Sequence, residues 1–227
     1  MSSAIMAASL ACIDLTLEGL TTGLNLELSP GTAALFTAAG EQECLLLART
    51  FAGERPPDSG RILLGDACLA ELGRSQLHQL RRAIGIVSPQ GGLISNLKLW
   101  ENITLPLLFH DGCVPESASR TIRSLLDAFG FTGNIWALPG HLTPFERRMA
   151  AFIRAAVSGA RCLIYAGCFD NLPHRERDLL VEQAAGLHRS NAGMISLYLT
   201  ATTTPLDHLE PDLHCNLRHQ PAQITRT

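Results

Sequence analysis

Short apolar runs alternate with segments of helical periodicity along most of this chain, and this alternation restricts the fold more than any other feature. The apolar runs have the length of buried strands and lie at residues 33–37, 84–87, 162–165 and 194–200. The helical segments lie at residues 45–52, 72–82, 116–129, 144–158 and 174–187. Strands that alternate with helices build a parallel sheet covered by helices. The sequence therefore predicts an α/β fold with a mixed, mostly parallel sheet as its core.

Two segments depart from this alternation. Residues 12–28 carry loosely alternating apolar residues around a glycine turn, which predicts a small N-terminal antiparallel β part. Residues 96–159 are mostly helical, and a helix that begins near Leu99 is expected to break at Pro106. We therefore expect a single domain over residues 1–227, with a core at 1–95 and 160–202, an inserted helical lobe at 96–159, and a loosely structured tail at 203–227.

Composition restricts the functions that are open to such a fold. The hydrophobic content of 46% and the charged content of 17% are typical of a globular chain. The net charge of −3 provides no positive surface for nucleic acid, which we therefore exclude as a partner. No apolar run reaches the ~20 residues of a membrane-spanning helix. Lys98 is the one lysine among the 18 basic residues, so chemistry that needs a lysine elsewhere is excluded.

Residues 56–109 carry the most specific pattern. The run SGRILLGD at 59–66 resembles the turn and strand S-G-x-I-x-x-x-G, and LRRAIGIVSPQ at 80–90 resembles a strand that ends in a loop glutamine, here Gln90. In this order and spacing the chain is similar, over about residues 24–202, to the ATP-binding subunit of ABC transporters. The run WENITLPL at 100–107 resembles the subunits that serve lipid, lipoprotein and MCE-type phospholipid systems. The resemblance implies a P-loop NTPase-like ABC ATPase domain with a RecA-like core.

The resemblance places a phosphate-binding loop at residues 38–45, where the family has G-x-x-x-x-G-K-[ST]. Five residues are vestiges of this loop: Ala38, Gly40, Glu43, Cys44 and Leu45. Cys44 stands where the family's lysine reaches the β- and γ-phosphates, and Leu45 stands where a hydroxyl holds Mg²⁺. Glu41 and Glu43 place negative charge at a helix N-terminus that favours anions, and they would repel a triphosphate.

The catalytic acids implied by the resemblance are also replaced. In the family the buried strand at 162–165 leads into Asp-Glu, of which the aspartate organises Mg²⁺ and the glutamate polarises the attacking water. Ala166 and Gly167 occupy those two positions. Asp170 follows in the loop that meets a partner subunit, or is an ordinary turn residue. Ala201 stands near the position of the family's switch histidine, so this role has no residue.

The signature sequence L-S-G-G-E/Q is only partly matched. Leu142, Thr143 and Glu146 fit it, while Pro144 and Phe145 replace the glycine pair. Thr143 followed by Glu146 three residues later predicts a capping box, with a proline at the first helical position. The sequence therefore predicts that the helix is kept while its surface for phosphate is lost.

A further set of residues lies between the loop glutamine and the helical lobe. Gln90 is either the retained family glutamine or an ordinary loop residue, and both interpretations stay open. In the family the groove beside it receives a helix of the transmembrane subunit, which by resemblance assigns docking to five residues: Leu93, Ile94, Leu97, Leu99 and Trp100. An apolar groove with an aromatic anchor is typical of a helix-binding surface. Core packing is the alternative for these side chains, and it is favoured for Leu99.

These patterns favour a catalytically inactive ABC-type subunit, a pseudo-ATPase, that scaffolds or regulates a membrane transporter, with lipid as the favoured cargo. Its implied partners are a transmembrane permease and a second ATPase subunit, identical or different, at the cytoplasmic face of the inner membrane. We expect no cofactor, with ATP and Mg²⁺ bound only if the pseudo-enzyme interpretation is wrong, and no metal site of its own. The alternatives are an active ATPase with atypical motifs and a stand-alone α/β binding or regulatory protein.

Overall fold

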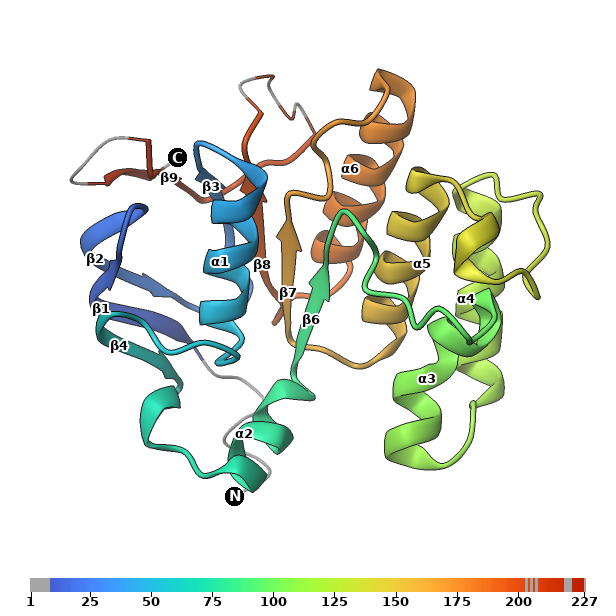
Figure 1. The fold of residues 1–227 in the computed structure, drawn as a ribbon, viewed down its shortest axis with the longest axis horizontal. Helices are drawn as coiled ribbons and strands as arrows, with labels where there is room; N and C mark the ends of the chain where they lie inside the picture. Colours follow the sequence, from blue (N-terminus) through green and yellow to red (C-terminus); the bar gives the residue numbers. More distant parts are fainter. Residues whose placement is uncertain (1–8, 203, 205, 207, 219–221, 227) are drawn as a thin grey trace.

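The computed structural model describes residues 9–202, 204, 206, 208–218 and 222–226, apart from the side chains of residues 110 and 111. The chain forms two sheets with a helix between them and a group of helices on one side (Figure 1). This arrangement confirms the predicted α/β fold, with its mostly parallel sheet, its antiparallel N-terminal part and its helical lobe.

The larger sheet has six strands in the order β10-β9-β3-β8-β7-β6. They are β3 (Ala33–Thr37), β6 (Ile84–Val87), β7 (Cys162–Ala166), β8 (Ile195–Thr200), β9 (Leu213–Asn216) and β10 (Gln223–Arg226). The pairs from β9 across to β6 are parallel, and β10 pairs with β9 in the antiparallel direction. Parallel strands bring their carboxyl ends to one edge of the sheet. The loops after β3, β6, β7, β8 and β9 therefore meet at this edge.

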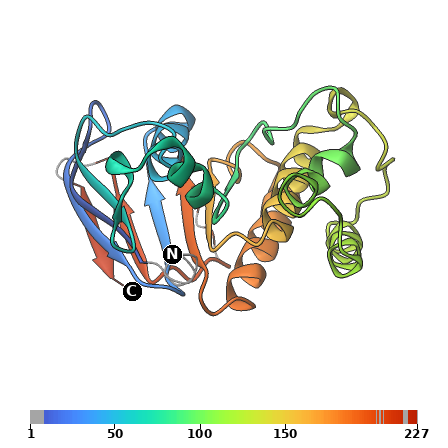
Figure 2. The ribbon, with the colours of Figure 1, turned by 90° about the horizontal axis from the view of Figure 1, so that it is seen from below.

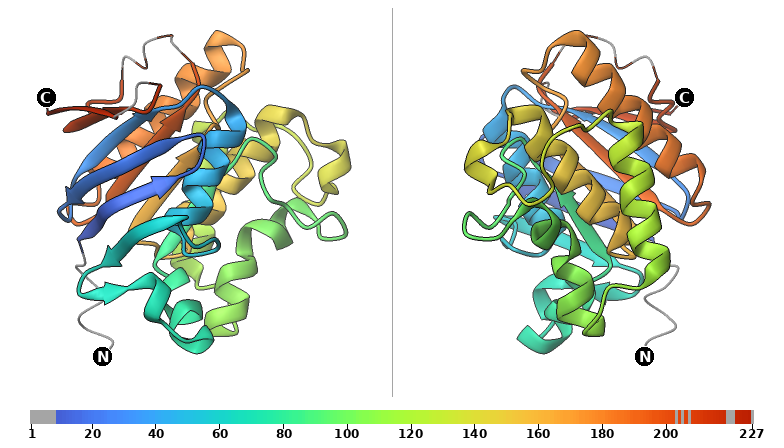
Figure 3. Two further views of the ribbon diagram at one scale, coloured as in Figure 1. Left: turned by 60° about the vertical axis from the view of Figure 1, so that its left-hand side comes forward. Right: turned by 90° about the vertical axis from the view of Figure 1, so that its right-hand side faces the viewer.

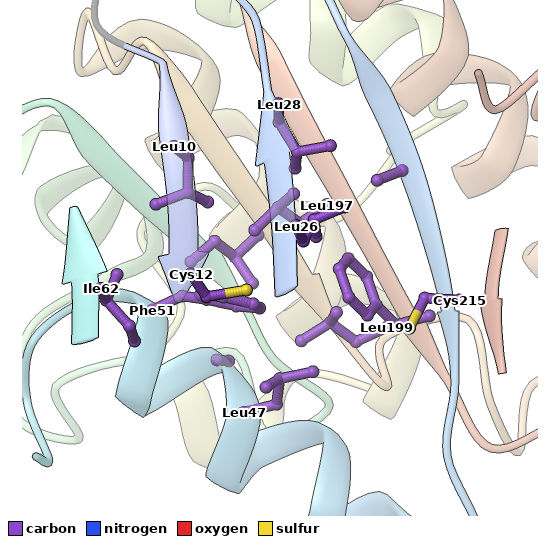
Figure 4. Packing of buried hydrophobic residues seen from close by; sticks show 14 of the residues in the cluster. Leu10, Cys12, Leu26, Leu28, Leu47, Phe51, Ile62, Leu197, Leu199 and Cys215 are labelled. Atoms are coloured by element: carbon purple, nitrogen blue, oxygen red, sulfur yellow. The ribbon is translucent and has the colours of Figure 1, made fainter. Parts of the chain in front are cut away.

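The smaller sheet is antiparallel, in the order β2-β1-β4-β5, and α1 (Glu41–Phe51) lies between it and the larger sheet. Its strands are β1 (Leu10–Leu17), β2 (Thr21–Leu28), β4 (Ser59–Leu64) and β5 (Ala67–Cys68). Leu47 and Phe51 of α1 share one apolar core with Ile62 of β4 and Leu199 of β8 (Figure 4). Because α1 is held from both sheets, the start of this helix is fixed at the edge where the strand loops meet.

The helices of the lobe and the helix that follows β7 lie on the opposite side of the larger sheet from the antiparallel strands (Figure 2). The lobe consists of α3 (Leu99–Asp111), α4 (Glu116–Ala128) and α5 (Pro144–Val157), and α6 (His174–Arg189) lies beside it (Figure 3). The short helices α2 (Arg74–Arg81), η2 (Leu69–Glu71) and η3 (Pro139–His141) connect these parts. A stack of aromatic rings joins lobe and sheet, since Tyr165 of β7 packs 5.2 Å from Tyr198 and 6.2 Å from Phe152 between ring centroids.

The structure differs from the expected loose tail at residues 203–227, because β9 and β10 lie there and β9 extends the parallel sheet beside β3. Leu213 and Cys215 of β9 are buried, while His214 on the same strand bonds through its Nε2 to the Thr37 hydroxyl at 2.7 Å. A four-residue strand with two buried side chains gives too short an alternation to be identified from sequence.

The prediction that Pro106 breaks the lobe's first helix is wrong. Helix α3 continues through Pro106 to Asp111 and ends at Gly112, which has a left-handed φ of 71°. The proline removes one backbone hydrogen bond. Ile103 and Leu107, on either side of it, are buried, and this packing outweighs the lost bond.

The hydroxyl of Tyr165 is buried and finds no hydrogen-bond partner among the described residues. An unpaired buried hydroxyl is destabilising, so Tyr165→Phe is expected to leave stability unchanged or raise it by about 1 kcal/mol. Tyr198 stacks on Tyr165, and its hydroxyl is not one of the buried unpaired groups, so Tyr198→Phe is the matched control that is not expected to raise stability. Urea denaturation of the three chains measures both changes, and equal losses in the two variants would contradict the interpretation.

Candidate functional site

The loop after β3 is built as a strand–loop–helix corner at the edge where the strand ends meet. Ala38 donates its backbone N–H to the Thr200 carbonyl at 2.9 Å, and α1 begins at Glu41 after Gly40. Glu43 turns back along the helix, and its Oε2 accepts the backbone N–H of Ala39 at 2.6 Å. The N-terminal end of α1 is thus occupied by a carboxylate of the chain itself.

Cys44 and Leu45 take apolar roles at the positions of the family's lysine and hydroxyl. Cys44 is fully buried, and burial raises the pKa of its thiol to about 12, helped by the negative charges of Asp170, Glu43 and Glu41. The thiol is therefore neutral at physiological pH. Leu45 packs against the core between the two sheets. Neither side chain can supply a positive charge or an oxygen ligand for Mg²⁺.

The backbone turns into a left-handed conformation just after β7. Ala166 is fully buried, and Gly167 has a left-handed φ of 66° while its N–H bonds to the Leu199 carbonyl at 2.8 Å. A side chain on Gly167 would point between Glu41 and Asp170, since the Cβ position lies 3.5 Å from Cγ of Glu41 and 3.7 Å from Oδ2 of Asp170. The position of the family's glutamate is therefore adapted to glycine.

Asp170 is 5% exposed, and both of its carboxylate oxygens are engaged. Oδ1 accepts the Thr200 hydroxyl at 2.5 Å, and Oδ2 accepts the backbone N–H of Ala201 at 2.8 Å. Sequence reasoning left open whether this aspartate is a turn residue. In the structure it joins the loop after β7 to the segment where the switch histidine is missing.

Two arginines that sequence reasoning did not single out reach this region. Arg218, which follows β9, donates through Nε to the Ala38 carbonyl at 2.9 Å and through a terminal nitrogen to the Ala201 carbonyl. Arg148 of α5 donates to carbonyls of the loops after β6 and β7. The signal for Arg148 was a charged residue beside the apolar positions that form the buried face of α5. For Arg218 no local pattern pointed to the site.

The predicted capping box is present at the start of α5. Thr143 Oγ1 accepts the N–H of Glu146 at 3.1 Å, and Glu146 Oε2 accepts the N–H of Thr143 at 2.7 Å. Pro144 occupies the first helical position, and Phe145 packs edge-on against Phe129 with ring centroids 6.1 Å apart. The residues that replace the glycine pair therefore serve the helix and the lobe core.

The predicted docking residues divide into exposed and buried ones. Ile94 is 43% exposed, whereas Leu99 is fully buried in the lobe core, so its assignment to docking is wrong. Trp100 is half-buried and packs 6.4 Å from Trp136, which is 53% exposed. The backbone N–H groups of residues 99 and 100 bond to the carbonyls of residues 137 and 135. Two apolar segments thus flank the start of α3, and sequence reasoning missed the second.

The remaining predicted positions lie in the loop that leads from β6 into the lobe. Leu93 is half-buried against the lobe core, Leu97 is half-buried, and Gln90 is exposed. Buried Asn102 shapes the end of this loop, since its Oδ1 accepts the N–H of Ile94 at 2.7 Å and its Nδ2 donates to the Leu97 carbonyl at 2.9 Å. We call Ile94, Trp100, Trp136 and the exposed Leu138 the lobe patch.

Solved structures identify the class of the fold. The dimeric ATP-binding cassette MJ0796, bound to ADP and Pi, matches with a TM-score of 0.77 and 17% identity over 92% of this chain and 94% of that one. CbiO1 of Clostridium perfringens, part of the ABC transporter complex cbiONQ, matches with a TM-score of 0.73 and 17% identity over 93% of this chain and 85% of that one. The fold is therefore that of an ABC transporter ATPase domain.

Sequence comparison agrees with the fold, although no family model matches the chain. Methionine import ATP-binding protein MetN 1 of Yersinia pestis is 32% identical over 108 residues, 48% of this chain and 31% of MetN. The intermembrane phospholipid transport ATP-binding protein MlaF of Haemophilus influenzae is 28% identical over 134 residues, 58% of this chain and 50% of MlaF. These ABC transporter ATP-binding proteins are homologues of this chain, which spans about a third to a half of their length.

The relatives overturn the expectation that this chain takes no cofactor. MetN and MlaF are ATP-binding proteins, and MJ0796 is bound to ADP and Pi. ATP is therefore the ligand that the comparisons indicate for this fold. Cys44 and Leu45 show only that a nucleotide here would be held without the family's lysine and hydroxyl.

The substitution Gly167→Ala tests whether the backbone at the end of β7 requires a glycine. Gly167→Ala is expected to cost about 1–2 kcal/mol, because an L-residue is strained at φ 66° although its Cβ would meet only ordinary van der Waals contacts. Gly186→Ala in α6 places its Cβ in open space and is expected to stabilise by up to about 1 kcal/mol, since alanine favours a helix. Thermal unfolding compares the two, and equal shifts would contradict the assignment.

Proposed function

We propose that this chain is the ATP-binding-domain subunit of an ABC-type transporter, and that its own residues do not carry out ATP hydrolysis. One observation gives the strongest support to the absence of ATP hydrolysis. The four positions that resemblance assigns to phosphate, Mg²⁺ and water chemistry hold Cys44, Leu45, Ala166 and Gly167, and none of these can carry a charge at neutral pH. Phosphoryl transfer depends almost entirely on placed charge, so it loses its main source of acceleration here.

The acids that remain near the loop support the same conclusion. Glu43 accepts a backbone N–H of the loop, and Asp170 accepts a hydroxyl and a backbone N–H. Asp170 uses both of its oxygens in these bonds, and Glu43 uses its Oε2. A general base or metal ligand must have a lone pair directed at water or metal, and these three oxygens are directed at donors of the chain.

Two partners fit the structure. The lobe patch is a solvent-facing apolar surface with two tryptophans, which is typical of a site for a helix of another protein. We propose that it receives the transmembrane permease and that the ATPase domain pairs with a second one, identical or different, as in the dimeric MJ0796. None of the helices formed by the described residues combines the length and apolar character that a bilayer crossing requires.

The cargo and location follow by analogy with the relatives. MlaF serves intermembrane phospholipid transport and MetN methionine import. The run WENITLPL favours the lipid systems, so we propose a lipid-related cargo and a place at the cytoplasmic face of the inner membrane. In a homodimer both composite sites would lack the catalytic residues, whereas a heterodimer with an intact subunit would keep some of them.

Hydrolysis and binding are separated by measuring both on the purified chain with Mg-ATP. Phosphate release by the wild-type chain is expected to equal that of the Cys44→Ala and Asp170→Asn variants, because neither side chain takes part in ATP hydrolysis. Calorimetry on the same samples reports binding independently. Phosphate release by the wild type that disappears in Asp170→Asn would show an active enzyme with atypical motifs and overturn the proposal.

Trp136→Ser tests the lobe patch as a docking surface. The change removes the most exposed ring of the patch, and association with the co-expressed permease is expected to fall about tenfold or more, as for an aromatic anchor at an interface. Phe109→Ser is the matched control, since this ring is 68% exposed and lies near the other end of α3, where it packs against His78. Co-purification that responds equally to both changes, or to neither, would exclude the patch as the docking site.

A further inference from the structure

Arg148 occupies an unusual place for a charged residue. It lies on the inner face of α5, is 6% exposed, and has buried Met149 and Phe152 as helix neighbours. Its guanidinium donates through Nε to the Pro89 carbonyl at 3.2 Å, and through Nη1 to the carbonyls of Cys168 at 2.9 Å and Asp170 at 2.6 Å. One lobe side chain thus reaches two separate loops of the core.

These two loops belong to the edge where the parallel strands end. Pro89 follows β6, while Cys168 and Asp170 follow β7. The side chain of Asp170 in turn holds Thr200 and Ala201 after β8. Arg218 continues the chain of contacts from Ala201 to Ala38 after β3. The hydrogen bonds therefore run without a break from the lobe across the ends of the central strands.

The energetics explain why an arginine is suited to this position. Burying a guanidinium is costly unless its donors are satisfied, and burial does lower the pKa of Arg148. The nearby negative charges of Glu41 and Asp170 oppose that shift and favour the cation. A planar fork can reach carbonyls on two loops at once, whereas a lysine ammonium is a single point.

A second arginine of α5 reinforces the contact. Arg154 donates to the carbonyls of Gly91 at 2.8 Å and Gly92 at 2.9 Å. The loop from β6 into the lobe is therefore held to α5 on both sides of Gln90. At Gly91 an added Cβ would lie 2.6 Å from the Arg147 carbonyl, which shows how closely this loop lies against the helix.

We propose that Arg148 is a positioning residue that latches the helical lobe to the strand-end loops, so that this chain keeps lobe and core in one arrangement without a nucleotide between them. Arginines of α5 bond to the carbonyls of Pro89, Gly91, Gly92, Cys168 and Asp170 in these loops, and in this proposal no ligand is required to order them. The latch concerns the conformation of the subunit, and it holds whether or not ATP binds to the loop at residues 38–45.

Hydrogen exchange of the full chain tests the latch, with Arg148→Met compared with Arg147→Met on the same helix. The guanidinium of Arg147 donates to the Leu142 carbonyl next to its own helix and makes no hydrogen bond to the described residues of either core loop, and the Cβ of Arg147, which lies near Gly91, is kept in the methionine variant. Arg148→Met is expected to speed exchange at residues 88–92 and 167–171 about tenfold or more, because charge-assisted bonds are lost. Arg148→Lys is expected to fall between wild type and Arg148→Met. Equal exchange in both methionine variants would overturn the proposal.

A second measurement remains decisive if Arg148→Met does not fold. Exchange of the same loops in the wild-type chain is expected to be slow and unchanged when Mg-ATP is added. Loops that exchange freely until Mg-ATP is added would show that nucleotide orders them, and the latch would be excluded. Phosphate release by the wild type would instead overturn the proposed function and leave the latch intact, so the two failures are distinguishable.

Discussion

The placement of α1 between the two sheets is the constraint on which the rest of this structure depends. Leu47, Ala48 and Phe51 of this helix are buried in the core that the sheets share. A helix held from both sides cannot shift when its first residues change, so the loop before it keeps its place at the strand ends. The fold of an ATP-binding domain is therefore maintained by packing, and the residues at the open end of α1 were free to change. Cys44 illustrates the result, since a neutral buried thiol adds to the core where the family has a charged lysine.

Side chains near the strand ends form a connected set of hydrogen bonds. Glu43 accepts a backbone N–H just before α1, Asp170 accepts a hydroxyl and a backbone N–H at the end of β8, and Arg218 donates to the carbonyls of Ala38 and Ala201. These donors and acceptors bond to each other, which lowers the cost of keeping a polar corner partly buried. The loops at this edge are therefore held by groups of the chain itself.

The sequence predicted the parts that depend on local pattern. Strands β3 and β6 were placed at their observed bounds, because short apolar runs between polar turns are typical of central parallel strands. Helix α1 begins at Glu41 and not at Leu45, because the polar residues of its first turn fall outside the apolar run that marked the helix in the sequence. The residues that the sequence did not predict reach the site through contacts between distant parts of the chain. Arg218 reaches the site from 180 positions away in sequence, and Trp136 joins the lobe patch through a loop with no periodicity.

The conformation of Gly167 shows that the site has been rebuilt and has not merely lost side chains. Its left-handed φ of 66° disfavours an acid at this position, and the space where a side chain would point is bordered by Glu41 and Asp170. A glutamate introduced there would meet strain and two negative charges, while a lysine at position 44 would stand at a fully buried position. Restoring the family's residues at these two positions would therefore require changes in their neighbours as well.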